Sequence, residues 1–106
     1  MKERLDSKEN ETSFDEMAEN LIKNFASEEI AQMEAGNIGI LQHDLEARVA
    51  SAVRKMEDAK GKGDADLFAK HLLFKLDASR FTGSKIEGKS DSIKSKAVEF
   101  LNEYIS

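Results

Sequence analysis

One octapeptide has the residue types of a phosphate-binding loop. GSKIEGKS, residues 83–90, matches G-x-x-x-x-G-K-[ST] at its four fixed positions, Gly83, Gly88, Lys89 and Ser90. In such a loop backbone N–H groups wrap the phosphates of a nucleotide, the lysine reaches the β- and γ-phosphates, and the hydroxyl holds Mg²⁺. A strand must lead into the loop, but residues 76–82 have helical periodicity. We interpret the octapeptide as a connection between two helices, with Ser90 capping the second, and keep nucleotide binding as a remote alternative.

The other residue types that could support catalysis or metal binding are sparse. The chain has two histidines and no cysteine, so thiolate metal sites and cysteine nucleophiles are excluded. His43 lies off the apolar stripe of its helix and should be exposed, whereas His71 borders an apolar face and should be half-buried. Carboxylates are numerous, but no nucleophile motif such as G-x-S-x-G accompanies them. We therefore predict no metal, no cofactor, no small-molecule substrate and no enzymatic activity.

Cationic side chains are concentrated in the second half of the chain. Residues 1–50 carry 5 basic and 12 acidic side chains, whereas residues 51–106 carry 11 basic and 9 acidic ones. The cations that could bind phosphates are Arg54, Lys55, Lys60, Lys62, Arg80, Lys85 and Lys89. They fall near two consecutive helix connections, which lie at opposite ends of an up-down bundle. Nucleic-acid binding by these cations is therefore kept as the alternative function.

Hydrophobic periodicity predicts an all-α domain, a small irregular bundle. Residues 1–12 are mostly charged or polar and are expected to form a disordered tail, with residues 13–106 as the single domain. Apolar spacing predicts four main helices and one short helix, at about 13–26, 40–60, 64–82 and 90–105, with the short one at about 27–35.

Helix boundaries are expected at residues that cap well. Ser13 and Glu16 have the spacing of a capping box, which would start the first helix. The apolar register breaks near Ser27, so Ser27 is expected to cap the short helix, and Asp64 to cap the helix of residues 64–82. In the helix of residues 40–60, Asp44 and Arg48 can pair at i,i+4 on the outer face.

The helix of residues 64–82 is apolar on two faces. Phe68, Leu72 and Leu76 project from one side. Four residues centre almost opposite them: Leu67, Phe74, Ala78 and Phe81. The second face is either core, in a helix packed between the others, or a surface for a partner or a second copy.

The second face leads to the functional prediction. By elimination we predict a non-enzymatic regulatory or adaptor protein that binds another protein, or a second copy of itself as a homodimer, through Leu67, Phe74, Ala78 and Phe81. The longest apolar runs, such as residues 72–74, are far too short to cross a membrane. We expect no membrane contact and a cytoplasmic location.

Overall fold

The computed structural model describes residues 2–31, 37–82 and 86–105, with side chains from Ser13 onward within those ranges. These residues form four α-helices and one π-helical turn, and no strand occurs among them, which confirms the all-α prediction. In chain order the elements are α1 (Lys2–Phe25), η1 (Ala26–Ile30), α2 (Ile38–Lys60), α3 (Lys62–Ala78) and α4 (Ser90–Ile105).

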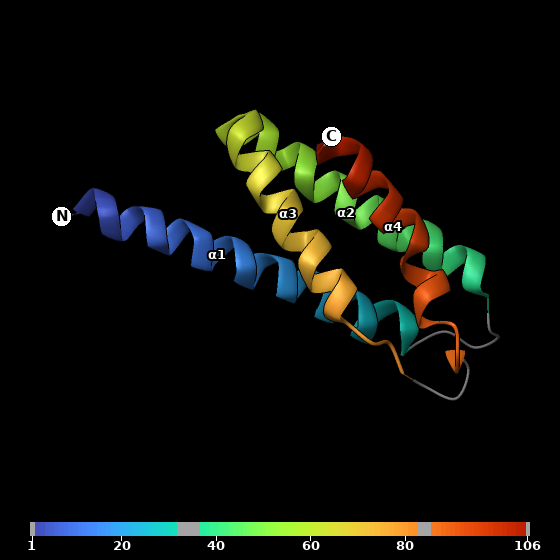
Figure 1. The fold of residues 1–106 in the computed structure, drawn as a ribbon. Coiled ribbons are helices and arrows are strands. Elements are labelled where there is room, and N and C mark those ends of the chain that lie inside the picture. The colour runs from blue at the N-terminus through green and yellow to red at the C-terminus, as the bar shows by residue number, and fades with distance from the viewer. Residues whose placement is uncertain (1, 32–36, 83–85, 106) are drawn as a thin grey trace.

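Helices α2, α3 and α4 pack together, and α1 lies against α3 (Figure 1). Helices α2 and α4 run in the same direction, because Gln42 near the start of α2 donates to the Ser92 carbonyl near the start of α4 at 2.7 Å, and Tyr104 near the end of α4 donates to Glu57 near the end of α2. Helix α3 runs opposite to both. Helix α1 runs parallel to α3, and its N-terminal half projects beyond the other helices, so the molecule measures 51 × 23 × 19 Å (Figure 1).

The core is built around the inner face of α3. Its most buried large side chains, Phe68, Leu72 and Leu76, are at most 1% exposed, as the 3.6-residue spacing predicts. The other helices turn one apolar stripe each toward this face, with buried residues Phe14, Ala18, Ile22 and Phe25 from α1, Leu41, Leu45, Val49, Val53 and Met56 from α2, and Ile93, Ala97 and Leu101 from α4. Each buried Leu, Val, Ile, Phe or Met contributes about 1.5–3 kcal/mol.

The first helix begins earlier than the capping box predicts. Helix α1 is continuous from Lys2 through Ser13, so the predicted start at Ser13 is wrong. Residues 2–12 are rich in Lys, Glu and Arg, whose good helix propensity favours extension of the helix toward the N-terminus. The mobility of a tail at residues 1–12 stays a prediction.

The expected register break near Ser27 is present, but no new helix is capped there. The chain widens into the π-helical turn η1, directly after Phe25, whose backbone is still helical at φ −58° and ψ −46°. A π turn adds one residue per turn and so rotates the side chains that follow it. Ile30 can thereby pack against the core, while the Ser27 hydroxyl donates to the Asn24 carbonyl at 3.2 Å instead of capping. The predicted continuation over residues 32–35 lies outside the described residues.

A glycine joins α2 directly to α3. Gly61 has a φ of 96°, which favours glycine over any residue with a side chain, and its N–H donates to the Glu57 carbonyl at 2.8 Å. Helix α3 begins at the next residue, so Asp64 lies within its first turn and is not its N-cap. An acidic side chain in that turn still favours the helix through the dipole.

Helix α3 ends at Ala78, four residues before the predicted end at Thr82. The ammonium group of Lys94 in α4 donates to the carbonyls of Leu76 at 2.9 Å and Ser79 at 2.8 Å. The Leu76 carbonyl also accepts the Ser79 N–H at 3.1 Å, and the Ser79 carbonyl also accepts from Arg80 at 2.9 Å. Lys94 adds a charged donor to each of them, from a side chain that is only 5% exposed. Beyond the cap the chain is extended at Ser79, with φ −77° and ψ 148°.

We predict that Lys94→Met lowers the free energy of unfolding by about 1–3 kcal/mol, because it removes two charge-assisted hydrogen bonds to the end of α3 while keeping an aliphatic side chain there. Urea denaturation followed by far-UV circular dichroism measures this. The matched control is Lys96→Met, two residues along the same helix at an exposed position, which should change stability by less than about 0.5 kcal/mol. Equal effects of the two substitutions would contradict the capping role.

Candidate functional site

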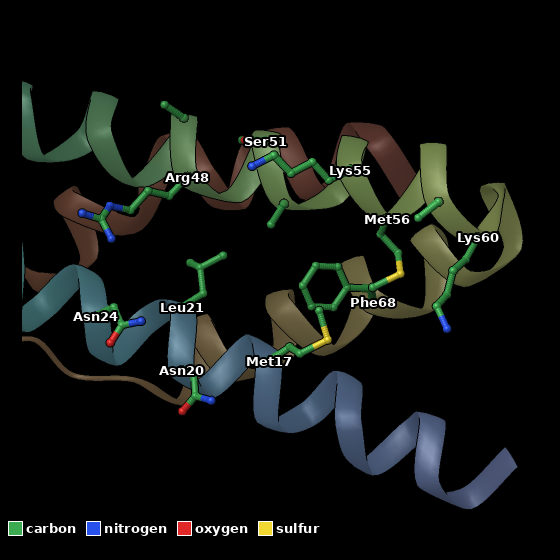
Figure 2. A pocket seen from close by; sticks show the side chains of 13 residues that line it. Met17, Asn20, Leu21, Asn24, Arg48, Ser51, Lys55, Met56, Lys60 and Phe68 are labelled. Carbon is green, nitrogen blue, oxygen red and sulfur yellow. The ribbon is translucent and has the colours of Figure 1, made fainter. Parts of the chain in front are cut away.

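An open groove lies between α1 and α2. Helix α1 packs on α3 more than on α2, so the two helices leave an open groove of about 820 Å³ with α3 as its floor (Figure 2). The lining residues are Met17, Asn20, Leu21 and Asn24 from α1, Ala47, Arg48, Ser51, Ala52, Lys55, Met56, Ala59 and Lys60 from α2, and Phe68 from α3.

The lower part of the groove is apolar. Figure 2 shows Leu21 pointing from α1 into the space between the helices, with Met17 and Met56 approaching Phe68 from opposite sides. Met17 is 42% exposed, so its thioether is available at the surface. Methionine side chains are flexible and polarizable, and they adapt to apolar ligands of different shapes. The groove therefore presents an apolar and adaptable floor.

The two rims of the groove differ in charge. On the α1 side the polar lining residues are the neutral amides Asn20 and Asn24. On the α2 side Lys55 and Lys60 are exposed, and neither forms an ion pair within the described residues. The groove thus combines an apolar floor with a positive edge.

Arg48 closes one end of the groove. Its guanidinium donates to the carboxylates of Glu28 and Glu29, each at 2.8 Å, so the expected pairing with Asp44 is replaced by one between α2 and η1. The hydrogen bond to Glu28 is the main cause that raises the pKa of Arg48 above its ordinary value. At the opposite end, near Lys60, helix α1 diverges from α2 and the groove is open (Figure 2).

Polar contacts help to hold α1 on α3. Asp15 lies 3.6 Å from Nδ1 of His71 and 3.2 Å from Nζ of Lys75. Phe14 packs on Phe68 with ring centroids 5.9 Å apart. His71 is half-buried, as predicted, and its contacts are with α1. This row of contacts keeps α1 on the far side of the groove from α2.

The apolar residues of the groove were not among the sequence-predicted site residues. Met17, Leu21 and Met56 lie on apolar stripes, which is typical of core, and nothing in the pattern shows that α1 leans away from α2. A weak signal exists, because Met17 and Leu21 are spaced at i,i+4 along one edge of a stripe whose centre is Phe14, Ala18, Ile22 and Phe25.

The predicted second face of α3 is only partly assembled. Phe74 is 69% exposed, Ala78 is exposed, and Leu67 is half-buried against the core. Phe81 lies beyond the end of α3 and is only 7% exposed, with its ring 5.6 Å from that of Phe25. Its expected place on this face is wrong, because the early end of α3 turns Phe81 inward.

The candidate phosphate-binding cations divide between the two ends of the bundle. Near the connection of α2 to α3, Lys62 pairs with Asp66 at 2.6 Å, and Arg54 lies over Phe100 at 5.8 Å. Lys55 and Lys60 line the groove. The structure therefore does not gather these cations into one surface.

The remaining cations lie at the other end, as the up-down topology predicts. Arg80 donates to the carbonyls of Asp77 and Ser79, and Lys89 is exposed just before α4. Lys85 lies outside the described residues.

The octapeptide has the geometry of an inter-helix connection where it is described. No strand precedes it within the described residues, although the helical conformation ends at Ala78 and not at Thr82. Ile86, in the middle of the octapeptide, is 1% exposed and packs into the core. The Ser90 hydroxyl accepts the N–H of Phe81 at 2.9 Å, so it holds the connection in place and does not cap α4. Residues 83–85 lie outside the described ranges.

The described part of the chain lacks two further features. No group of three or more His, Cys, Asp or Glu residues there is arranged to hold a metal ion. No helix there is both long enough and apolar enough to cross a membrane. His43 is exposed, as predicted.

The fold and surface define a small helical bundle with an open apolar groove. No family model matches the chain, and neither the curated proteins nor the solved structures compared with it include a significant match.

The aromatic corner near Lys62 gives a spectroscopic test of the structure. Tyr104, at the end of α4, donates its hydroxyl hydrogen to the Glu57 carboxylate of α2, and Lys62 lies 3.9 Å from the Tyr104 ring centroid. Desolvation, and then the hydrogen bond and negative charge of Glu57, raise the pKa of Tyr104 to about 12. The chain has one tyrosine and no tryptophan, so its ultraviolet titration reports this group alone.

We predict that absorbance at 295 nm titrates with a midpoint near 12 in the folded protein and that Glu57→Gln lowers the midpoint. The folded state holds the phenolic proton more tightly than the unfolded state. The contribution of protonated Tyr104 to the free energy of unfolding is therefore complete below about pH 10 and is lost as the pH rises toward 12. Far-UV circular dichroism at each pH confirms that the helices persist. A midpoint near 10 with intact helices would contradict the contact.

Proposed function

We propose that this chain is a non-enzymatic regulatory or adaptor protein that binds a helix of a partner protein in the groove between α1 and α2. The observation that carries the proposal is the open groove of about 820 Å³, with apolar side chains from both helices and Phe68 as its floor. A cytoplasmic setting, expected from the sequence, is part of this proposal.

A helix suits the groove because its walls are two helices. Met17 and Leu21 are four residues apart on α1, and Ala52 and Met56 are four apart on α2, so each wall presents a ridge with helical spacing. A third helix with apolar residues at i, i+3, i+4 and i+7 can place its own ridge between them. Binding would bury Met17 and supply α2 with the neighbour that α1 does not provide.

Small residues on α2 favour close approach of the partner backbone. Ala47, Ser51 and Ala59 also line the groove, and none has a side chain large enough to fill it. The bound helix would therefore contact α2 closely while the flexible methionines adjust to its apolar side chains.

The charge of the rim selects among possible helices. Lys55 and Lys60 form a positive edge on α2, and the α1 edge is neutral. A partner helix with acidic residues beside its apolar face would pair with that edge, and such pairs contribute more to orientation and association rate than to affinity. We therefore propose an acidic amphipathic helix as the partner segment.

The nucleic-acid alternative gains no support from the cations. Those near the α2–α3 connection and those near the start of α4 lie at opposite ends of the bundle, and several are held by protein groups. A continuous basic surface is what phosphate-backbone binding requires.

We predict that a fluorescein-labelled amphipathic peptide of about 18 residues, with a Leu stripe flanked by Glu, binds the protein, and that its Lys-flanked counterpart binds at least about tenfold more weakly. Fluorescence anisotropy titrations at low salt measure both dissociation constants. Met17→Glu, which places a negative charge at an already exposed position of the groove, should weaken binding of the Glu-flanked peptide.

Charge reversal supplies the specificity test. The double substitution Lys55→Glu with Lys60→Glu should invert the preference toward the Lys-flanked peptide, whereas Lys96→Glu, an exposed lysine on α4 outside the groove, should leave it unchanged. Absence of binding by either peptide at millimolar protein, or binding that ignores Met17→Glu, would refute the proposal.

A further inference from the structure

The outer face of α3 carries the most exposed aromatic residue among the described residues. Phe74 is 69% exposed, although the inner face of the same helix is fully buried. A phenyl ring left in water retains a large unfavourable apolar area, and its burial against a partner would remove that area from water. This position is on the side of α3 opposite the core and is not part of the groove between α1 and α2.

Shallow hollows flank the Phe74 ring. One, of about 410 Å³, lies between α3 and α4 and is lined by Leu73 and Val98 beside Phe74. The other, of about 270 Å³, lies between α3 and α1 and includes Leu67. The ring thus stands as a ridge between two depressions that combine apolar and polar side chains, a shape to which a second ridge of the same kind can fit.

Opposite charges border the ring along α3. Lys70 lies four residues before Phe74 and Asp77 lies three residues after it, so all three share one side of the helix. Both charged side chains are on exposed residues, and neither forms an ion pair within the described residues. Along the axis of α3 this face therefore presents a positive charge at Lys70, the aromatic ring of Phe74 and a negative charge at Asp77.

We propose that this face binds a second copy of the chain, with the two α3 helices antiparallel and a two-fold axis beside Phe74. In that arrangement Lys70 of each copy faces Asp77 of the other, and the two Phe74 rings meet at the centre. A parallel arrangement would place Lys70 against Lys70 and Asp77 against Asp77, which is repulsive at both ends. An isologous two-fold interface must be self-complementary. The charges on this face meet that condition only when the two α3 helices are antiparallel.

The dimer leaves the groove between α1 and α2 free. None of the residues that line the groove lines either hollow beside Phe74. The two surfaces can therefore be tested separately, and loss of one function leaves the other measurable.

We predict that the full chain dimerises in sedimentation equilibrium and that Phe74→Asp weakens the dimer at least about tenfold, because two desolvated charges would meet at the axis. Far-UV circular dichroism should be unchanged, since the side chain is exposed in the monomer. A chain that stays monomeric up to millimolar concentration, or a dimer that Phe74→Asp leaves intact, would overturn the proposal.

Charge reversal tests the antiparallel register. Lys70→Glu puts a carboxylate against Asp77 at both ends of the interface, and Asp77→Lys puts two ammonium groups together, so each variant alone should dimerise at least about tenfold more weakly than wild type at low salt. An equimolar mixture of the two variants should recover association, because both contacts become attractive in the heterodimer. Lys96→Glu is the matched charge control and should not change association. Equal association of the mixture and the separate variants would rule out this register.

Discussion

The burial of one face of α3 is the constraint on which the rest of the structure depends. Phe68, Leu72 and Leu76 are enclosed by side chains from α1, α2 and α4, so α3 is the helix against which all three of the others pack. Helix α1 buries its apolar stripe against α3 and has little contact with α2, so the groove stays open between α1 and α2. The same constraint leaves the opposite face of α3, with Phe74, directed to solvent.

Local periodicity predicts the helices whose ends are set by local chemistry. Helix α4 begins at Ser90 as expected, and α2 ends at Lys60 because Gly61 follows it. The end of α3 could not be predicted in this way, because it is fixed by Lys94, a residue in the next helix. The helical periodicity of apolar residues continues in the sequence as far as Phe81, although α3 ends at Ala78.

The sequence predicts a second apolar face on α3, and only part of that face is at the surface. Phe74 is exposed to solvent, whereas Phe81 is buried in the core. The groove could not be predicted, because a residue such as Leu21 occupies the same position on a helical projection whether it faces core or a gap. What separates the two cases is the angle between α1 and α2, and this depends on packing between residues far apart in the chain.

The enclosure of Lys94 has a consequence for amine chemistry. Its ammonium group is bound to two carbonyls beneath the surface, whereas lysines such as Lys96 are open to solvent. An acylating reagent would modify the open amines first and reach Lys94 only when the corner between α3 and α4 separates. The rate of Lys94 acylation therefore reports how often that corner opens locally.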